Sequence, residues 1–473
     1  MRTDQSRHVV VVGGGISGLA AAHRVLVDRP GTRVTLVEAG PRFGGKLRAG
    51  EVAGAPVDLG AESLLARRPE AVGLAREVGL GPDMQPPAVL GARLWTRGAL
   101  RPMPGGHVMG VPGDTGALAA SGVLSEAGLA RLAADADMPA TPIGEDVAIG
   151  RHVAERLGQE VVDRLVEPLL GGVYAGDPHL ISLRAAVPQL FEAARTHRSL
   201  GEAVRALQAR AAAAPAQQGP VFAGIAGGIG RLPLAVADAC RAAGADLLAD
   251  TPVTGLRRTE HGWAVRIAPA GEAERELAAD AVIIAAPAAP AAAVLAEVAP
   301  GAAAELRAVE YASMALVTMA FRRSELPEAI TAGDSSGFLV PPVDGRTIKA
   351  STFVSNKWAW AAADPELFLL RTSVGRHGDE SDLKREDAEL VDVSLADLGD
   401  AVGLAARPVD STVTRWEGGL PQYPVGHLDR VARIRAGVAA HPGLAVCGAL
   451  YDGVGVPACV ASADAAVEAA LPR

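Results

Sequence analysis

The sequence predicts an α/β protein that begins with a Rossmann-type nucleotide-binding domain. Residues 8–12 (HVVVV) are a β-branched run, typical of a strand buried on both faces. A glycine-rich turn follows, and then a helical pattern runs from Ile16 to about Asp28, where Pro30-Gly31 ends it. Residues 33–38 (RVTLVE) form a second strand. This is the βαβ unit that parallel nucleotide-binding sheets require.

The turn between the first strand and the helix reads Gly13-x-Gly15-x-x-Gly18. Gly13 allows a tight turn, Gly15 lets the backbone approach a pyrophosphate, and Gly18 permits close packing of helix on strand. The helix then presents free N–H groups and a partial positive charge to the phosphates. Glu38 ends the second strand, where its carboxylate would accept hydrogen bonds from adenosine ribose hydroxyls. The alternative is a structural glycine turn that binds no ligand.

Two further segments near the N-terminus suggest contacts with a cofactor. Arg42-Phe43-Gly44-Gly45-Lys46 places a glycine pair between cations, which makes a second anion nest. An NAD enzyme does not need such a nest, and the alternative is a pair of solvated loop charges. The segment 58–63 (DLGAES) is polar and bears a glycine, which fits a loop lying against the cofactor but is not specific.

The middle of the chain divides into a helical part and a β-rich part. Residues 111–215 show helical periodicity, and the low-complexity stretch 211–219 closes them. Strand signals return at 246–284, with a hairpin around Gly262, and residues 281–285 (AVIIA) form a buried strand. Residues 311–374 alternate in β fashion.

The C-terminus returns to the nucleotide-binding pattern. A strand at 444–448 (LAVCG) precedes a glycine-rich turn and a helix from about Pro457, a residue that suits a first helical turn. The positive end of this helix would favour negative charge on a bound cofactor. A simple packing element is the alternative. The sequence therefore predicts that the nucleotide-binding domain is discontinuous.

Composition excludes several classes of protein. A chain of 473 residues predicts two or three folding units, and a net charge of −9 argues against nucleic-acid binding. The three cysteines, Cys240, Cys447 and Cys459, have no zinc or CxxC spacing, so buried reduced thiols and a cytoplasmic location are expected. The histidines show no metal spacing either. The apolar stretch 281–300 contains two prolines and a glutamate, which makes a membrane-spanning helix improbable.

These motifs together resemble the FAD-binding superfamily of amine oxidases, phytoene desaturases and protoporphyrinogen oxidases. More specific segments resemble the bacterial protoporphyrinogen/coproporphyrinogen III oxidase family of haem biosynthesis, and the resemblance covers nearly the whole chain. They are 58–81 (DLGAESLLARRPEAVGLAREVGLG), 161–178 (VVDRLVEPLLGGVYAGDP), 414–427 (TRWEGGLPQYPVGH) and 444–462 (LAVCGALYDGVGVPACVAS). The segments GGVYAGDP and LPQYPVGH are more specific than the glycine motif.

The resemblance implies one non-covalent FAD per chain, O2 as electron acceptor, a cyclic tetrapyrrole as substrate, and chemistry performed by the flavin without a catalytic side chain that can be named. It implies three substrate contacts, Arg93, Gly172 and Tyr174. It also implies FAD contacts from Gly13, Gly14, Gly15, Ile16, Ser17, Gly18, Glu38, Ala39, Arg42, Gly45, Lys46, Gly60, Ala61, Glu62, Ser63, Val253, Trp416, Val454, Gly455 and Val456.

The expected architecture is a Rossmann-type FAD-binding domain with an α+β substrate domain and a helical insertion. We assign residues 1–85, 220–300 and 410–473 to the FAD-binding domain, 86–110 and 301–409 to the substrate domain, and 111–219 to the insertion. Membrane relatives in the family dock through this insertion, but it has no strong apolar face here. The sequence therefore predicts at most peripheral membrane contact.

Two porphyrinogens are candidate substrates. We favour coproporphyrinogen III, which carries four propionates and is the more soluble, over protoporphyrinogen IX, which carries two. Basic residues including Arg93, Lys349 and Lys357 could pair with the propionates. The product could pass to a ferrochelatase. A flavin amine oxidase, a carotenoid desaturase or a flavin-free escort protein of the same fold stay open as alternatives.

Overall fold

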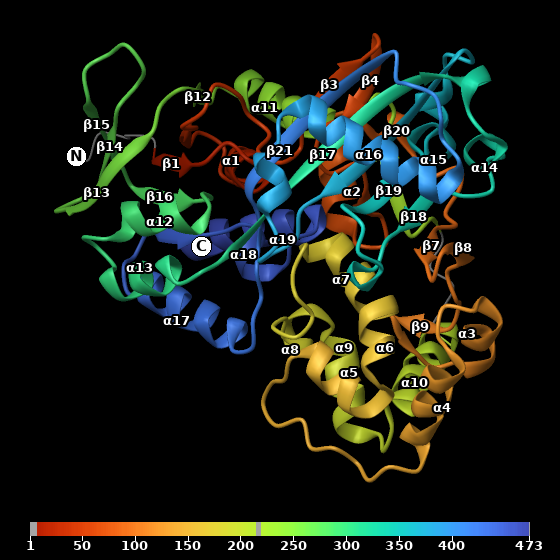
Figure 1. Ribbon diagram of the computed structural model, residues 1–473. Helices are drawn as coiled ribbons and strands as arrows, with labels where there is room; N and C mark the ends of the chain where they lie inside the picture. The colour runs from red at the N-terminus through yellow and green to blue at the C-terminus, as the bar shows by residue number, and fades with distance from the viewer. Residues whose placement is uncertain (1–6, 214–218, 473) are drawn as a thin grey trace.

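The predicted βαβ unit forms the centre of a five-stranded parallel sheet (Figure 1). The computed structural model describes residues 7–213 and 219–472. In the order of the sheet, the strands are β12 (Asp246–Leu248), β2 (Arg33–Val37), β1 (His8–Val12), β16 (Ala281–Ile284) and β22 (Leu444–Val446). The discontinuity expected from the sequence is present in this sheet, because β22 pairs with β16 although more than a hundred residues separate them.

Helices cover both faces of this sheet, which explains why β1 is apolar at nearly every position. Val9 and Val11 pack on one side, and Val10 and Val12 on the other. The first side holds α1 (Ile16–Asp28), α2 (Pro69–Glu77), α11 (Arg231–Ala242) and α19 (Val456–Ala470). The second holds α12 (Ala288–Leu295), α13 (Pro300–Arg307), α17 (His427–Ala439) and the ribbon β13 (Val253–Thr259), β14 (Gly262–Ile267) and β15 (Arg275–Ala279), which contains the expected hairpin.

The second large sheet has seven strands. In order they are β21 (Asp410–Pro421), β17 (Tyr311–Arg322), β20 (Leu367–Val374), β19 (Ile348–Thr352), β18 (Gly337–Leu339), β7 (Arg93–Thr96) and β8 (Ala99–Pro102). All neighbours are antiparallel except β18 and β7. Helix α16 (Asp387–Val402) covers one face. The domain boundary predicted at residue 410 is wrong, because β21 pairs with β17 along its whole length and so belongs to this sheet.

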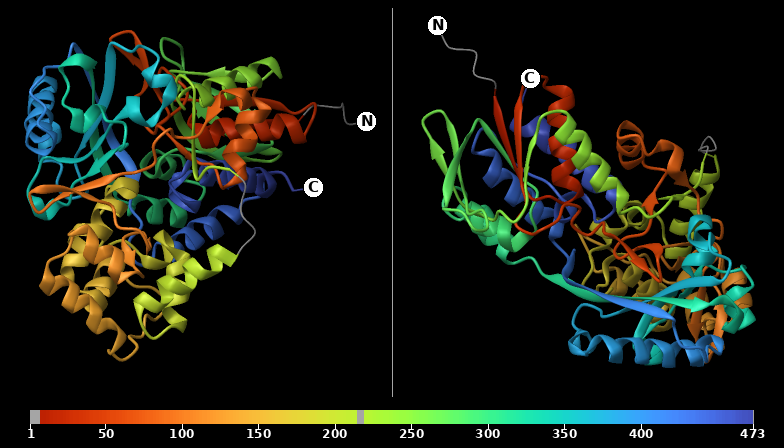
Figure 2. Two further views of the ribbon diagram at one scale, coloured as in Figure 1. Left: turned by 90° about the vertical axis from the view of Figure 1, so that its right-hand side faces the viewer. Right: turned by 90° about the horizontal axis from the view of Figure 1, so that it is seen from above.

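The expected helical insertion forms a lobe below the two sheets in Figure 1 and in the left view of Figure 2. It contains a π-helical turn at Val162–Val166 and the helices α3 (Thr115–Ser121), α4 (Glu126–Ala133), α5 (Ile149–Leu157), α6 (Gln159–Val161), α7 (Glu167–Tyr174), α8 (Leu183–Ala186), α9 (Pro188–Thr196) and α10 (Leu200–Ala213). A buried ion pair joins Arg156 to Asp135 at 2.6 Å within it. Of the low-complexity stretch 211–219, residues 214–218 lie outside the described residues.

Short elements connect these three parts. They are the hairpin β3 (Ala49–Val52) and β4 (Ala55–Asp58), the small sheet of β5 (Leu64–Leu65), β11 (Phe222–Ile225) and β6 (Met84–Gln85), the pair β9 (His107–Val108) and β10 (Val111–Pro112), and the helices α14 (Glu328–Thr331), α15 (Val354–Lys357) and α18 (Ala449–Asp452). Within the described part of the chain, no helix combines the length and the apolar character needed to cross a membrane.

Candidate functional site

A cavity of about 1070 Å³ lies where the parallel sheet, the seven-stranded sheet and the insertion meet. It lies at the upper end of the range of roughly 300–1,000 Å³ that pockets for one small ligand cover, so it can hold a large ligand. Leu65, Phe222 and Val173 line it and are each more than a third exposed, which marks its opening.

Most of the residues expected to contact FAD line this cavity, although they come from seven separate segments of the chain. Gly172 and Tyr174, two of the three expected substrate contacts, line it as well. The lining members of the FAD set are Gly13, Gly15, Ile16, Ser17, Glu38, Ala39, Gly45, Lys46, Gly60, Ala61, Glu62, Ser63, Val253, Trp416, Val454, Gly455 and Val456. The fold therefore brings the predicted cofactor residues together.

The glycines of the first turn have two different roles. A Cβ on Gly18 would lie 1.9 Å from the Gly13 carbonyl oxygen, and one on Gly14 would lie 2.6 Å from the Phe43 ring. Gly14 and Gly18 are thus required for packing inside the protein, and neither lines the cavity. A Cβ on Gly15 would meet only the Gly45 Cα, at 3.9 Å. Nothing in the protein fills the space beside Gly15, which is what close approach of a pyrophosphate needs.

Two helices begin at the cavity wall without a side-chain cap. Gly15 is the N-cap of α1 and Gly455 is the N-cap of α19, and neither helix start has a hydrogen bond from a capping side chain. The first backbone N–H groups of α1, and those of α19 other than at Pro457, which has none, are therefore available to acceptors in the cavity, where the positive ends of the helices favour negative charge. This arrangement fits a diphosphate at α1 and the electron-rich edge of a flavin at α19.

Glu38 holds the glycine turn while facing the cavity. Its Oε2 accepts a hydrogen bond from the Gly14 N–H at 2.7 Å and its Oε1 accepts one from the Gly40 N–H at 2.8 Å. Each carboxylate oxygen can accept a second hydrogen bond, so the side chain can still receive ribose hydroxyls.

Arg42 does not line the cavity, which corrects its expected role as an FAD contact. Its guanidinium donates to the Gly45 carbonyl at 2.8 Å and lies over the Trp416 ring, with Cζ 5.7 Å from the ring centroid. Arg42 therefore supports the loop at Gly45 and the Trp416 ring from the side that faces away from the cavity. Lys46 does line the cavity, and burial lowers the pKa of its ammonium group.

The loop after β4 joins the flavin side of the cavity to the seven-stranded sheet. Arg371 on β20 donates to the Gly60 carbonyl at 2.8 Å, and the Trp416 indole N–H on β21 donates to the Leu59 carbonyl at 2.9 Å. The buried Glu62 pairs with Arg371 at 3.2 Å and with Lys357. Burial alone would raise the pKa of Glu62, but Arg371 and Lys357 outweigh it and lower that pKa.

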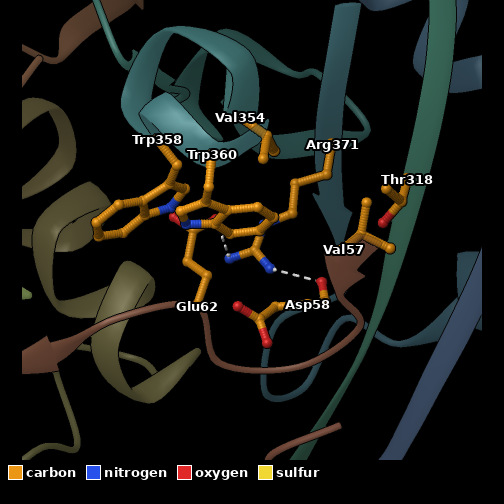
Figure 3. Close-up of a pocket in the computed structure, with 8 residues that line it drawn as sticks. All are labelled: Val57, Asp58, Glu62, Thr318, Val354, Trp358, Trp360 and Arg371. Carbon is orange, nitrogen blue, oxygen red and sulfur yellow. Dashed lines mark hydrogen bonds and ion pairs between the residues drawn. The ribbon is translucent and has the colours of Figure 1, made fainter. Parts of the chain in front are cut away.

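A compact group of charges lies behind this loop, as Figure 3 shows. The carboxylates of Asp58 and Glu62 lie beside the Arg371 guanidinium, beneath the rings of Trp358 and Trp360. Asp58 accepts hydrogen bonds from the backbone N–H groups of residues 229 and 230, both at 2.9 Å. Burial nevertheless raises the pKa of Asp58 to about 6. The two domains thus share a buried polar wall.

The opposite end of the cavity contains a second set of charges. Arg376, which follows β20, pairs with Oε1 of Glu167 on α7 at 3.2 Å and donates to the Val340 carbonyl at 2.9 Å. Burial raises the pKa of Glu167 to about 7, and burial also lowers the pKa of Lys349 on β19 to about 7. Among the described residues, no carboxylate lies within ion-pair distance of the Lys349 ammonium.

Arg93 does not line the cavity, so the structure gives no support to its expected role as a substrate contact, which stays a prediction. Its guanidinium forms an ion pair with Asp334, and its side chain is about a third exposed. Sequence reasoning missed Arg371, Arg376 and Glu167, which do line the cavity. Arg371 could have been suspected, because a buried strand with an apolar run (LFLL) seldom continues with arginine unless that arginine has a partner.

An aromatic stack supports the substrate side of the cavity. Tyr174 at the end of α7 packs against Tyr423 at 5.4 Å, and Tyr423 stacks on His427 at 4.0 Å and 12°. The Tyr423 hydroxyl donates to the Ala449 carbonyl, and burial lowers the pKa of His427 to about 4. The stack therefore fixes the insertion helix against the C-terminal elements.

The cysteines and the remaining polar groups indicate no metal centre in the part of the chain that the structure describes. Cys240, Cys447 and Cys459 are buried free thiols, as expected, and no cluster of metal-ligating side chains occurs among residues 7–213 and 219–472. Cys447 and Cys459 line the cavity, and burial raises the pKa of both thiols.

Comparisons with known proteins agree with this geometry. A model of the family described as flavin containing amine oxidoreductase matches residues 16–471. A coproporphyrinogen III oxidase of Mycobacterium tuberculosis is 39% identical, over 98% of this chain and 97% of that protein. A protoporphyrinogen oxidase of Macaca fascicularis is 30% identical, over 98% of each protein. A crystal structure from Exiguobacterium sp. 255-15 superposes with a TM-score of 0.84 at 31% identity, covering 98% of each chain.

Proposed function

This chain belongs to the flavin-containing amine oxidoreductase family, and we propose that it oxidises coproporphyrinogen III to coproporphyrin III with O2 as the final electron acceptor. It is an FAD-dependent oxidoreductase. Six electrons leave the macrocycle in three rounds, and each round yields one hydrogen peroxide. Bound FAD would accept one electron pair per round and pass it to O2.

The substrate end of the cavity carries the proposal. Lys349 and Arg376 line it beside Glu167, and Lys357 and Arg371 line the neighbouring junction beside Glu62. Basic groups outnumber carboxylates, and an incoming carboxylate would favour the charged form of Lys349, whose pKa burial lowers to about 7, so the site suits an anionic substrate. Charge-assisted hydrogen bonds to propionates would be strong in this partly desolvated place. Lys349 is the cation best suited to an added propionate, because it is only 8% exposed and has no ion-pair partner among the described residues.

The same charges disfavour an amine as substrate. A protonated amine entering this end would approach Lys349 and Arg376, and like charges in a buried site repel one another. The apolar parts of the wall, which include Leu316, Leu339 and Val340, instead offer contact area for a flat macrocycle. Sequence reasoning kept amine oxidation open, and the charge of the cavity argues against it.

Protoporphyrinogen IX is the second candidate, supported by the relative of that name. A cation that meets vinyl in place of propionate would be left unpaired in the cavity, so discrimination against this substrate should be large. The test is to measure kcat/KM for both porphyrinogens under air, at one salt and detergent condition. We expect a higher value for coproporphyrinogen III, and a steeper loss of it with added salt. Equal or reversed values would contradict the proposal.

We also propose that the flavin is held without a covalent bond. Cys447 and Cys459 line the cavity, but burial raises the pKa of both thiols, which leaves little thiolate to attack a flavin. Acid precipitation should leave the yellow colour in the supernatant, and colour retained in the pellet would contradict this. Peripheral membrane contact, a cytoplasmic location and transfer of the product to a ferrochelatase stay predictions.

A further inference from the structure

We infer that Glu167 is the proton acceptor in substrate oxidation, with Arg376 holding its carboxylate in place and Lys349 beside it. This inference rests on the proposed function. Each round breaks one C–H bond, whose hydrogen leaves with the electron pair to the flavin. It also releases one proton, from a pyrrole N–H or, after tautomerisation, from a bridging carbon. That proton needs an acceptor inside the cavity.

The lining of the cavity leaves few groups that could take this proton, namely its carboxylates and Lys349, whose pKa burial lowers to about 7. Its carboxylates within the described chain are Glu38, Glu62 and Glu167. Both oxygens of Glu38 receive backbone N–H groups of the glycine turn, at the nucleotide end. Both oxygens of Glu62 are paired, one with Lys357 and the other with Arg371. These two carboxylates are therefore engaged in holding the structure together.

Glu167 differs from the other two because one of its oxygens is free. Oε1 pairs with Arg376, but Oε2 is buried and has no hydrogen-bond partner in the structure. The residue is only 8% exposed and lines the cavity. A buried carboxylate oxygen without a partner is costly. Because Oε2 has no water-accessible surface, a donor on a bound molecule would meet it only when the side chain turns toward the cavity that Glu167 lines. A pyrrole N–H is such a donor.

The charges around Glu167 come from three elements. Arg376 follows β20, Lys349 lies on β19, and Asp177 follows α7. Burial raises the pKa of Glu167 to about 7, with the two cations opposing the rise and Asp177 adding to it. A pKa close to the working pH suits a group that must gain a proton and then release it to solvent in every round. The pKa values of Tyr174 and Cys459 are raised to about 12 and about 11, so these groups keep their own protons.

Each proton that the macrocycle loses is accounted for by a proton that the Glu167 carboxylate gains. An N–H bond or, after tautomerisation, a C–H bond of the macrocycle breaks, and an O–H bond forms on the Glu167 carboxylate. The carboxyl group then releases the proton to water, which restores the carboxylate before the next round. Three rounds deliver three protons through Glu167, while the other three hydrogens leave with the electron pairs.

The test uses the FAD-loaded enzyme with Glu167→Gln, which keeps the shape but cannot accept a proton. Anaerobic reduction of the flavin by coproporphyrinogen III is followed from about pH 5 to about pH 9. In the wild type, the rate should rise with pH through about 7, because the deprotonated carboxylate is the active form. Glu167→Gln should lower the rate at least about 100-fold and remove the inflection. Glu167→Asp should be slower than the wild type but should keep the pH inflection.

Two comparisons make the result specific. The exposed Glu192→Gln, on α9 of the same lobe, should behave as the wild type. Lys349→Met should weaken binding of the porphyrinogen but keep a pH inflection. A near wild-type rate in Glu167→Gln would overturn the inference, and so would an inflection that persists there. If Glu167→Gln fails to bind flavin, Glu167→Asp decides: a retained inflection supports the inference and a flat profile overturns it.

A second readout is independent of turnover. The infrared spectrum of the resting enzyme should contain a carboxylic-acid C=O band that titrates near pH 7 and is missing in Glu167→Gln. Absence of this band from the wild type would also overturn the inference. If coproporphyrinogen III is not oxidised at all, the proposed function fails, whereas the infrared titration and the profile with protoporphyrinogen IX still test Glu167.

Discussion

The two ends of the cavity are built in opposite ways. The flavin end is mostly backbone: glycines, two uncapped helix starts, and a single carboxylate, Glu38, that holds the turn. The substrate end is built from long charged side chains on separate elements, with Lys349 from the seven-stranded sheet, Arg376 from the segment after β20 and Glu167 from the insertion. The first end binds through space that glycine leaves open, and the second through charges that tertiary contacts bring together.

The largest expected effect comes from filling the space at the flavin end. Gly15→Val should abolish FAD binding, because its side chain would occupy the region where the pyrophosphate must lie. The apoprotein should still fold, since a Cβ at this position meets nothing closer than 3.9 Å. Flavin absorbance after purification and the far-UV circular dichroism spectrum measure the two effects separately.

The matched control for that change is Gly73→Val on α2, where a Cβ would meet no atom within 4 Å. This variant should keep its flavin. Gly15→Val should also keep the ability to bind coproporphyrin III at the substrate end, seen by quenching of porphyrin fluorescence. Normal FAD occupancy in Gly15→Val would show that the pyrophosphate does not lie in the space beside Gly15.

The next effect concerns the point where the two ends are joined. Glu62→Gln removes the carboxylate that pairs with Arg371 and Lys357, and leaves two cations without their partner in a buried place. Breaking such a pair costs about 3–5 kcal/mol, so thermal unfolding should occur at a clearly lower temperature. Glu276→Gln, which breaks a surface pair with Arg257, should leave the unfolding temperature unchanged. Equal unfolding temperatures for Glu62→Gln and the wild type would contradict the joining role.

A smaller effect is expected from the substrate end alone. Lys349→Met should lower kcat/KM for coproporphyrinogen III by about 10- to 100-fold, the equivalent of one lost charge-assisted hydrogen bond. The loss for protoporphyrinogen IX should be smaller, and flavin content should not change, because Lys349 contacts neither helix start. Lys384→Met, which removes an exposed lysine, provides the control. An equal loss with both substrates would mean that Lys349 does not pair with a propionate that only coproporphyrinogen III carries.

The smallest effect is expected on the pH dependence of stability, from the buried carboxyl group of Asp58 between the two sheets. The pKa of Asp58 is raised from 3.8 to about 6, so the folded protein keeps a proton there that the unfolded chain has already lost. Between the two pKa values the native state therefore binds more protons than the unfolded chain. The stabilising contribution of Asp58 falls as pH rises through this range. The free energy of unfolding of the wild type, relative to Asp58→Asn, should decline by at most about 1.4 kcal/mol per pH unit. A difference that is constant with pH would contradict the raised pKa.

The sequence alone determined where the flavin end begins, because most of the residues expected there line one cavity in the structure. Gly13, Gly15 and Gly18 could be recognised because one turn must satisfy a tight bend, a close phosphate and a helix packed on a strand within six positions. The C-terminal strand and helix could be recognised for the same reason, since alternation and turn chemistry are local properties. The resemblance of GGVYAGDP and LPQYPVGH to one family added the substrate class.

Only the tertiary structure decided how the charged side chains are used. Arg42 and Lys46 look alike in the sequence, yet Lys46 lines the cavity and Arg42 supports Trp416 from behind. Arg93 was expected at the substrate and pairs with Asp334 instead, whereas Arg376, which has no local signal, pairs with Glu167. The pairing partners are some 200 to 240 residues apart. A long side chain on a strand can reach several neighbours, and the partner it finds depends on which strands and helices the fold places beside it.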